Sequence, residues 1–276
     1  MPFKPIKKAV FPVAGIGTRL LPATKVMPKE MLTIVDRPLI QMAVEEARAA
    51  GIEEFIFIIN QDKDMLVQHF QDSQHLIDVL TERNKTELVN AVKTAQIPKN
   101  SFFTATQDKP LGLGHAVWCA RHLVGDEPFA VILPDDTVLN DEGCLSQMMK
   151  AYNSVGGNII ATCAVSENDT SKYGILDIIS SKGDMMEVRG LVEKPDPSEA
   201  PSNMAIFGRY ILQPEIFSYL ERHEKGVGGE IQLTDAMSHL IEDQNFHGFM
   251  FRGERLDCGS EIGFVKAQIA FALRKA

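Results

Sequence analysis

The residues with the clearest chemical potential lie near the start of the 276-residue chain, in a glycine-rich loop. Residues 14–19 read Ala-Gly-Ile-Gly-Thr-Arg and directly follow an apolar run, and Lys29 comes shortly after them. Glycines let backbone N–H groups approach a phosphate or a base closely, and such loops form nests that bind anions. Because Arg19 and Lys29 add positive charge to the same segment, it predicts a site for a nucleotide phosphate.

Two common nucleotide-binding patterns do not match this loop. The dinucleotide fingerprint needs a third glycine where the chain has Leu20, which disfavours a nicotinamide-dependent dehydrogenase. The P-loop pattern G-x-x-x-x-G-K-[ST] is absent from the sequence. A tight turn with surface lysines remains as the alternative without a ligand, and the presence of both Arg19 and Lys29 makes it the weaker one.

Carboxylates follow two apolar segments that lie far apart in the sequence. Asp135 comes after the run Phe129–Leu133, and Asp257 lies within the segment Arg255–Gly259. A carboxylate at the carboxyl end of a strand is well placed to bind Mg²⁺, which prefers oxygen ligands and keeps several waters. For either aspartate alone, a turn residue with an Asx-type hydrogen bond is the competing interpretation.

Polar residues also end two further strand-like runs. Gln107 closes residues 102–107, and its amide carries both a hydrogen-bond donor and an acceptor. Glu193 and Lys194 close another run, where the carboxylate can accept hydrogen bonds from sugar hydroxyls and the lysine supplies a point charge for a phosphate. A glutamine at a strand end is more often simply solvated, so its interpretation depends on the surrounding motifs.

The elements that must position these residues can be read from the hydrophobic pattern. Short runs rich in Val, Ile and Phe suit strands buried on both faces of a parallel sheet: Ala9–Val13, Glu54–Ile59, Phe102–Thr106 and Phe129–Leu133. Helical patterns lie between them: Pro38–Ala50, which Gly51 ends as a cap, Gln74–Ala95 and Gly114–Leu123. This alternation predicts a three-layer α/β domain with right-handed crossovers.

The second half of the chain has a different order of elements. Strand-like segments follow one another with turn residues between them: Asn158–Val165, Tyr173–Ile179, Val188–Glu193 and Ala205–Ile211. Helices are predicted at Pro214–Glu221, Thr234–Glu242 and Glu261–Leu273, with Thr234 as an N-cap and Asp235 in the first turn. Since no repeat or linker is visible, one α/β unit with a mixed second half is the favoured organisation.

Net charge and cysteine spacing disfavour several classes of protein. The chain carries 28 basic and 37 acidic residues, a formal net charge of −9, which argues against a nucleic-acid-binding surface. Its four cysteines contain no C-x-x-C pair, so we expect free thiols in a reducing cytosol. No stretch has the pattern of a signal peptide or approaches the ~20 apolar residues of a membrane span. We therefore expect a cytoplasmic protein without a nucleic-acid or membrane partner.

The glycine-rich segment resembles a known family signature. Over residues 15–29 the pattern G-x-G-T-R-x-x-P-x-T-x-x-x-P-K is similar to that of nucleoside-diphosphate-sugar pyrophosphorylases. The fuller form, FPVAGIGTRLLPATKVMPKEML with VDRP at residues 35–38, resembles the bacterial uridylyltransferase branch. Residues 28–30 read Pro-Lys-Glu, whereas the thymidylyltransferase branch usually has Ser-Lys-Gln. The resemblance extends from Ile6 to about Arg274.

The resemblance implies roles for individual residues. The nucleotide is implied to bind to Ala14, Gly15, Gly17, Thr18, Gln107 and Gly112, with Gln107 reading the N3–H and O4 edge of uracil. The sugar phosphate is implied to bind to Gly174, Glu193, Lys194, Asn203 and Glu230. Asp135 and Asp257 are the implied ligands of Mg²⁺, with Asp136 the weaker choice. Arg19, Lys29 and Lys194 are implied to assist catalysis by neutralising phosphate charge.

The resemblance also implies a fold and a reaction. The fold is a three-layer, Rossmann-like nucleotidyltransferase domain of the glycosyltransferase-A-like type, with a mixed, predominantly parallel sheet. It forms a single domain over residues 1–276, with about 1–140 as the nucleotide half and about 141–276 as the sugar half and C-terminal helices. The reaction transfers a uridylyl group from UTP to α-D-glucose 1-phosphate with Mg²⁺, in a homodimer or homotetramer. The alternatives are a thymidylyltransferase and an inactive paralogue that regulates an active partner.

Overall fold

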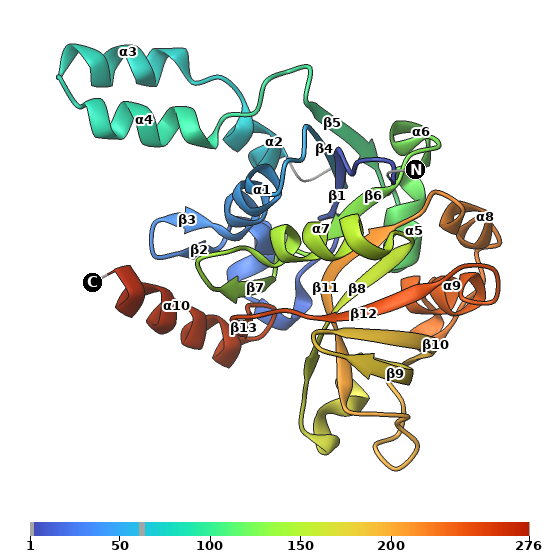
Figure 1. The fold of residues 1–276 in the computed structure, drawn as a ribbon. Coiled ribbons are helices and arrows are strands. Elements are labelled where there is room, and N and C mark those ends of the chain that lie inside the picture. Colours follow the sequence, from blue (N-terminus) through green and yellow to red (C-terminus); the bar gives the residue numbers. More distant parts are fainter. Residues whose placement is uncertain (1–2, 61–63, 276) are drawn as a thin grey trace.

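A nine-stranded mixed sheet forms the framework of the computed structural model, which describes residues 3–60 and 64–275. The strands lie in the order β5-β4-β1-β6-β11-β8-β12-β10-β9. Their bounds are β1 (Lys8–Pro12), β4 (Glu54–Ile59), β5 (Phe102–Thr106), β6 (Phe129–Ile132), β8 (Asn158–Ala164), β9 (Gly174–Lys182), β10 (Met185–Glu193), β11 (Met204–Leu212) and β12 (Phe246–Met250). The sheet runs through the whole body of the molecule (Figure 1).

The four strands of this sheet that come from the first half of the chain pair in parallel with one another, as predicted. β1 is parallel to both β4 and β6, with Val10 opposite Ile56 on one side and Val131 on the other. β5 adds to β4, also in parallel. The central residues of β1 and β4, and all of β6, are buried, which explains why these runs are apolar at almost every position.

The second half of the sheet is mostly antiparallel, which corrects the prediction of a predominantly parallel sheet. β11 runs antiparallel to β6 and β8, and β10 runs antiparallel to β9 and β12, while β8 and β12 form a parallel pair. Only residues 183–184 separate β9 from β10, and Gly183 has a φ of 62°. A connection this short can join only antiparallel neighbours, because a parallel pair needs a long crossover.

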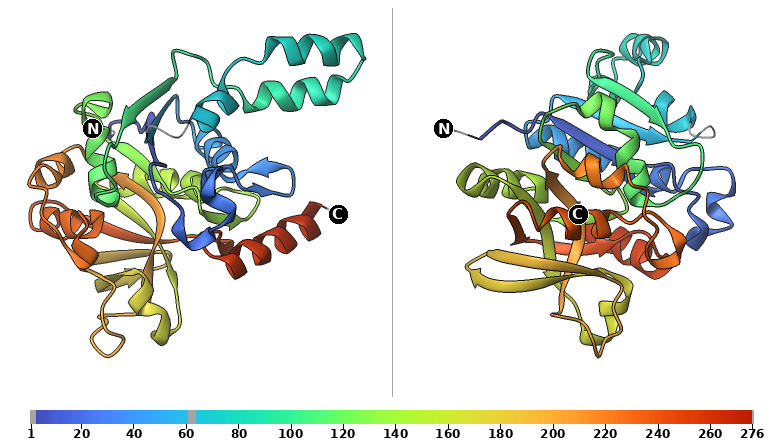
Figure 2. Two further views of the ribbon diagram at one scale, coloured as in Figure 1. Left: turned by 180° about the vertical axis from the view of Figure 1, so that it is seen from behind. Right: turned by 90° about the vertical axis from the view of Figure 1, so that its right-hand side faces the viewer.

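Helices cover both faces of the sheet, so the predicted three-layer architecture is confirmed. One face packs against α1 (Leu39–Ala49), α2 (Asp64–Phe70) and α7 (Cys144–Val155). The opposite face packs against α5 (Leu113–Cys119), α6 (Arg121–Val124), α8 (Ile216–Leu220) and α9 (Leu233–Leu240). Along β1, Phe11 contributes to the first core and Val10 to the second, because successive side chains of a strand point to opposite faces. Figure 2 shows these layers from two further directions.

Two segments predicted as single helices are each divided in the structure. Residues 74–95 form α3 (Gln74–Glu82) and α4 (Thr86–Ala95), which fold back on each other as a hairpin that projects from the body (Figure 1). Asn84 between them has a φ of 55°, a left-handed conformation that ends a helix and that asparagine tolerates. Residues 114–123 are divided between α5 and α6, with Ala120 as the cap between them.

The predicted cap positions of two other helices have different outcomes. Gly51, with a φ of 91°, follows the capping residue Ala50 of α1, so its predicted role at the helix end is confirmed. The prediction that Thr234 is an N-cap is wrong, because α9 already begins at Leu233 and Thr234 lies within its first turn. Its hydroxyl instead donates a hydrogen bond to Glu193 Oε2 at 2.8 Å. Asp235 lies in the first turn, as predicted.

Smaller elements complete the fold around the C-terminal helix. α10 (Glu261–Lys275) packs through Ala267 against Leu256 and Cys258. The remaining strands form two-stranded ribbons, β2 (Thr33–Ile34) with β3 (Arg37–Pro38) and β7 (Asp136–Leu139) with β13 (Glu254–Asp257). The 3₁₀ segments are Thr18–Leu20, Ala23–Lys25, Lys29–Met31, Glu167–Lys172 and Val227–Gly229.

Two further features concern the cysteines and the lengths of the helices. Cys119, Cys144, Cys163 and Cys258 are all free thiols. Within residues 3–60 and 64–275, no helix is both long and apolar enough to cross a membrane.

Candidate active site

The glycine-rich loop leaves the carboxyl end of β1 and folds into a tight nest. Gly17 has a φ of 71°, and a Cβ built there would lie 3.2 Å from Cβ of Lys29 and 3.3 Å from Cβ of Thr24. The Thr24 hydroxyl donates to the Gly17 carbonyl at 2.7 Å, which holds the two ends of the loop together. Both the backbone conformation and the close packing therefore require glycine at this position.

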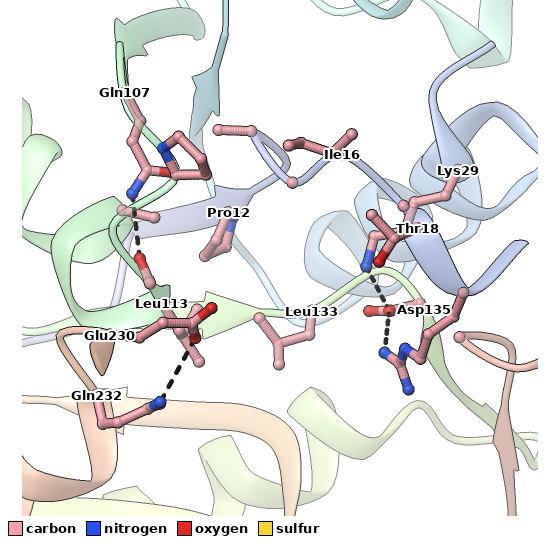
Figure 3. A pocket seen from close by; sticks show the side chains of 18 of the residues that line it. Pro12, Ile16, Thr18, Lys29, Gln107, Leu113, Leu133, Asp135, Glu230 and Gln232 are labelled. Carbon is pink, nitrogen blue, oxygen red and sulfur yellow. Dashed lines mark hydrogen bonds and ion pairs between the residues drawn. The ribbon is translucent and has the colours of Figure 1, made fainter. Parts of the chain in front are cut away.

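The nest opens into a cavity of about 640 Å³ that is lined by all of the predicted nucleotide residues (Figure 3). From the first half of the chain, its lining includes Ala14, Gly15, Gly17, Thr18, Arg19, Lys29, Gln107, Gly112 and Asp135. From the second half, it includes Glu193, Lys194, Glu230, Gln232 and Gly259. All six residues predicted for the nucleotide thus lie around one cavity at the carboxyl ends of the parallel strands, where open α/β sheets usually bind ligands.

A strong ion pair lies on one wall of this cavity. Lys29 Nζ is 2.6 Å from Asp135 Oδ2, and Arg19 Nη2 is 3.9 Å from the same oxygen. Burial acts to raise the pKa of Asp135, but the charge and hydrogen bond of Lys29 outweigh it and hold that pKa below its ordinary value. Burial likewise acts to lower the pKa of Lys29, and Asp135 outweighs it, so the pKa of Lys29 is raised. Both groups are therefore charged at neutral pH.

Asp135 and Asp257 face a common point beside Gly259. A Cβ built on Gly259 would lie 3.0 Å from Asp135 Oδ2 and 3.1 Å from Asp257 Oδ1, so the two oxygens flank the space that this glycine leaves open. The pairing of β13 with β7 produces this approach, since it places Asp257 opposite Asp136. Among the described residues, no group of three or more His, Cys, Asp or Glu side chains could enclose a metal. Two carboxylates fit an ion such as Mg²⁺, which keeps several waters or substrate oxygens.

The opposite end of the cavity is formed by Gln107 and the start of α5. Gln107 is buried, and its Nε2 donates to the carbonyl of Gly112 at 3.1 Å (Figure 3). A Cβ on Gly112, whose φ is 110°, would lie 2.7 Å from the carbonyl oxygen of Ile231. The α5 segment therefore packs directly on the backbone before α9, which fixes the position of Gln107 relative to the second half of the chain.

A second cavity of about 500 Å³ adjoins the first and contains three of the predicted sugar residues, Gly174, Glu193 and Lys194. The two cavities share part of their lining: Arg19, Leu113, Leu133, Asp135, Glu193, Lys194 and Gln232. A Cβ on Gly174 would lie 3.1 Å from Glu193 Oε2 and 2.8 Å from Ile206 Cδ1, so a side chain there would displace both of these groups. Asp257 also lines this second cavity.

Glu193 and Lys194 lie where the two cavities meet. Lys194 Nζ is 3.0 Å from Glu193 Oε1, and Thr234 donates to the other oxygen of the same carboxylate. The backbone of Lys194 has a φ of 48°, a left-handed conformation that is uncommon for a residue with a side chain. Such strained residues cluster at functional sites. Together, these contacts position one carboxylate and one cation toward the shared wall.

Two predicted sugar residues lie elsewhere. Glu230 lines the first cavity, near Gln232, and is not part of the lining of the second. Asn203 precedes β11 and lines neither cavity; its Nδ2 donates to the carbonyl of Val165 at 3.4 Å. Its sequence context suggested the sugar side, but the structure does not bring it to the other site residues.

A second acidic and basic pair, absent from the prediction, lies in the second cavity. Arg255 Nη2 is 3.6 Å from Asp136 Oδ1, and its guanidinium carbon lies 4.3 Å from the ring centroid of Tyr173. Burial raises the pKa of Asp136 to about 6, with the nearby Asp135 and Asp257 carboxylates adding to the effect of burial and Arg255 opposing it. Arg255 and Asp257 are two residues apart on β13 and therefore share a face, but the sequence alone does not show that this short segment is a strand.

A buried ion pair beneath the site supports the Asp135 loop. Arg209 on β11 is 1% exposed and pairs with Glu46 of α1, Nη2 to Oε2 at 2.8 Å and Nε to Oε1 at 3.1 Å. Arg209 Nη1 donates to the Leu133 carbonyl at 2.8 Å. Nothing in the local sequence predicted this pair, because its partners lie 163 residues apart.

The glycine-rich nest and the acidic pair on one cavity form an arrangement that suits a nucleotidyl transferase. The chain belongs to the nucleotidyl transferase family, whose model matches residues 8–272.

The chain is similar over nearly its whole length to family members that are named for a specific reaction. The UTP–glucose-1-phosphate uridylyltransferase of Komagataeibacter xylinus is 49% identical over 259 residues, covering 94% of this chain and 91% of that protein. A UTP-bound UDP-glucose pyrophosphorylase structure from Acinetobacter baumannii has a TM-score of 0.89 at 40% identity, covering 98% and 94% of the two chains. A UDP-glucose pyrophosphorylase complexed with UDP-glucose has a TM-score of 0.87 at 39% identity, covering 98% and 99%. The resemblance to this family and the three-layer α/β nucleotidyltransferase fold inferred from the sequence are both confirmed.

Proposed function

We propose that this protein transfers a uridylyl group from UTP to α-D-glucose 1-phosphate, giving UDP-glucose and pyrophosphate. One observation carries the proposal: the cavity below the phosphate-binding nest joins the cavity of Glu193 and Gly174 across a wall shared by Arg19, Asp135 and Lys194. A nucleotide and a sugar phosphate can therefore meet at charged groups. The names of the related proteins support this choice of substrates.

The reaction needs alignment and charge neutralisation more than a protein nucleophile. A phosphate oxygen of glucose 1-phosphate attacks the α-phosphorus of UTP in line, and the bond to the bridging oxygen breaks with its electron pair leaving on pyrophosphate. Both reactants are polyanions that repel each other, so fixed positive charges lower the barrier. Arg19 and Lys29 at the nest are suited to the departing pyrophosphate, and Lys194 to the attacking phosphate.

We propose that Asp135 and Asp257 hold Mg²⁺ in this site. The open space beside Gly259 and the two facing carboxylate oxygens support this assignment. A bound Mg²⁺ supplies charge neutralisation at the reacting phosphates. Lys29 neutralises Asp135 in the structure, and it would be free to turn toward phosphate if Asp135 held the metal.

The two ends of the site divide recognition between base and sugar. Gln107 and Gly112, at one end, are proposed to contact uracil, with Ala14 and Gly15 close to the same base. Glu193 and Gly174, at the other, are proposed to contact the glucose ring, because the carboxylate accepts hydrogen bonds and the glycine permits close approach. Asn203 and Glu230 remain predictions for the sugar side.

Pyrophosphate release tests the reaction directly. Purified protein is incubated with Mg²⁺, glucose 1-phosphate and each of UTP, dTTP, ATP, CTP and GTP, and the UTP reaction is repeated with galactose 1-phosphate and with a chelator. Fast release with UTP alone, abolished by the chelator, is expected. Preference for dTTP would overturn the substrate assignment and leave the metal site in place. No release by folded protein with any nucleotide would favour the inactive, regulatory paralogue.

Two further properties belong to the same proposal. We expect a homodimer or homotetramer, and an apolar row on the exposed face of α10 supports it: Ile262, Val265, Ile269 and Leu273. Light scattering after size-exclusion chromatography measures this directly. We also expect a cytoplasmic location, supported by the four cysteines that remain free thiols.

A further inference from the structure

The amide of Gln107 has both of its N–H groups committed to the protein. Nε2 lies 3.1 Å from the carbonyl oxygen of Gly112 and 3.0 Å from Nδ1 of His115. The amide oxygen accepts no hydrogen bond from the residues that the structure describes, and it is not among their fully buried atoms. Since Gln107 lines the nucleotide cavity, its oxygen is the atom left to meet a ligand.

The carbonyl of Gly112 fixes which way this amide points. A carbonyl oxygen accepts hydrogen bonds but cannot donate, so it must face Nε2 rather than the amide oxygen. Gly112 is held in turn by the backbone of Ile231, which leaves no room for a side chain at that position. The orientation of Gln107 therefore follows from the backbone and does not depend on an arbitrary choice between oxygen and nitrogen.

His115 completes the arrangement only in one protonation state. With the first N–H of Gln107 on Gly112, the second points at Nδ1 of His115, which must be an acceptor and carry no proton. The neutral ring with its proton on Nε2 satisfies this requirement. A ring protonated on both nitrogens would place an N–H against an N–H and release the amide from its position.

We propose that His115 is a positioning residue that holds Gln107 as an acceptor for the N3–H group of uracil, so that protonation of His115 weakens nucleotide binding. This inference rests on the proposed function and deepens it, because it names how one edge of the base is selected. Uracil and thymine both present a donor at N3. Cytosine presents a lone pair there, which the oxygen of Gln107 repels.

The groups around His115 favour its neutral form. Burial, the nearby His223 ring and the Arg121 guanidinium all act to lower its pKa. The His223 ring lies 5.4 Å from that of His115, between centroids. On its own helix, Cys119 Sγ lies 3.8 Å from Nδ1 of His115. Burial and the Asp108 carboxylate both act to raise the pKa of the Cys119 thiol.

The other elements packed against α5 include β1, β4, α8 and α9. They share the core with α5 through apolar residues such as Val10, Ile58, Ile216 and Met237. The neutral state of His115 is therefore the stable one at neutral pH, and Gln107 keeps its orientation there. As pH falls through the lowered pKa of His115, nucleotide affinity should be lost.

The test compares two substitutions at the same position. His115→Leu removes the acceptor, whereas His115→Asn replaces Nδ1 with an amide oxygen that accepts but does not titrate. Isothermal titration measures the dissociation constant for UTP and for CTP between about pH 5 and pH 8, the range in which histidine changes charge. Turnover with UTP is measured in parallel, and thermal melting checks that each variant is folded.

At pH 8 we expect His115→Leu to bind UTP about tenfold more weakly than the wild type, the effect of one hydrogen bond. Its preference for UTP over CTP should fall by a similar factor. His115→Asn should rescue most of the affinity. As pH falls, protonation of UTP itself should weaken binding to both proteins equally. The wild type should lose additional UTP affinity in acid, and His115→Asn should not show this additional loss.

A neighbouring histidine provides the matched control. His223 lines neither cavity of the site, and its φ of 51° is a conformation that asparagine tolerates. His223→Asn should keep UTP affinity at pH 8 and should move the acid transition to higher pH, because it removes a charge that lowers the pKa of His115.

The results separate this inference from the proposed function. Unchanged UTP affinity in His115→Leu, or an acid transition that persists unchanged in His115→Asn, would overturn the role of His115 even when UTP turnover is normal. UTP binding without pyrophosphate release would overturn the proposed reaction alone, and the comparison of the variants still decides the role of His115. Failure of the wild type to bind UTP would overturn both.

Discussion

Lys29 and Asp135 lie 106 residues apart in the sequence, yet Lys29 Nζ and Asp135 Oδ2 are 2.6 Å apart in the structure. The pair joins the loop after β1 to the loop after β6, and the two side chains are only 20% and 15% exposed. The proposed triphosphate-binding cation and the proposed metal-binding carboxylate therefore hold each other in place before any ligand arrives.

Replacing Lys29 with alanine should remove most of the catalytic activity. The loss of one charge directed at the transition state commonly costs about 3–4 kcal/mol, or ~100–1000-fold in rate. We expect this loss in kcat/KM for pyrophosphate release, with a far-ultraviolet circular dichroism spectrum like that of the wild type. Lys25→Ala is the control, because Lys25 is exposed in the same segment and lines neither cavity. Near-normal activity of Lys29→Ala would contradict the assignment.

Asp257→Asn should shift the dependence on Mg²⁺. The amide keeps the shape of the carboxylate but lacks its charge, so a higher Mg²⁺ concentration is needed for half-maximal rate. We expect an increase of about ten- to one-hundredfold, by analogy with the loss of other metal-site groups. A titration of activity against Mg²⁺ measures it, with exposed Asp126→Asn as the matched control. An unchanged titration curve would place the metal elsewhere.

Gly259→Ala should damage the metal site without changing any ligand. The added Cβ would lie 2.9 Å from Arg19 Nη2 and close to both carboxylate oxygens, in the space proposed for the ion. We expect activity to fall at least tenfold at saturating Mg²⁺, the factor that 1.4 kcal/mol of lost stabilisation produces. Gly190→Ala is the comparison, because a Cβ there meets its nearest atom at 3.6 Å. Equal activity of the two variants would show that the space beside Gly259 is not used.

Arg209→Met should destabilise the fold strongly, because it leaves Glu46 buried without its partner. Removing one member of a buried pair typically costs about 3–5 kcal/mol in the free energy of unfolding. Urea denaturation measures this change. Arg189→Met is the control, because Arg189 pairs with Asp177 at 2.9 Å but is 65% exposed, and exposed pairs add little. A small loss for Arg209→Met would mean that the interior relaxes around Glu46.

Asp136 should contribute a falling component to the dependence of stability on pH. Its pKa is raised from 3.8 to about 6, so the folded protein binds the proton more tightly than the unfolded chain does. The stabilisation is complete below the unfolded pKa and is lost as pH rises through the folded one, a change of about 3 kcal/mol at 1.36 kcal/mol per unit. Asp136→Asn removes this component. With a chelator present, the stability of Asp136→Asn should therefore rise relative to that of the wild type between pH 4 and pH 7. If the urea-denaturation midpoints of the two proteins differ by the same amount at every pH, the raised pKa of Asp136 is contradicted.

The parallel half of the fold could be predicted closely because its signals are local. The strands Glu54–Ile59 and Phe102–Thr106 agree with the structure at both ends, since each is a short apolar run bounded by polar residues. The break at Asn84 could not be seen, because no glycine or proline marks it. The ribbon of β7 and β13 also could not be predicted, since its strands are short and more than a hundred residues apart.

The candidate site shows the same division between local and distant information. The nest was visible because its glycines and cations lie within residues 14–29. The contact of Arg255 with Asp136, and that of Thr234 with Glu193, depend on how distant strands and helices meet. Thr234 resembles a helix cap in the sequence, but its hydroxyl donates a hydrogen bond to the half-buried carboxylate of Glu193 instead. Asn203 is the opposite case: its local sequence matches the family pattern, but the fold does not place it in either cavity.

β11 has a consequence for how substrates enter. It forms hydrogen bonds to β6 on one side and to β8 on the other, so a single buried strand joins the sheet of the first half of the chain to that of the second half. A hinge rotation between the two sides of β11 would break the hydrogen bonds of one of these ladders. We therefore expect any closure over the site to come from the loops above the sheet, while the sheet itself stays rigid.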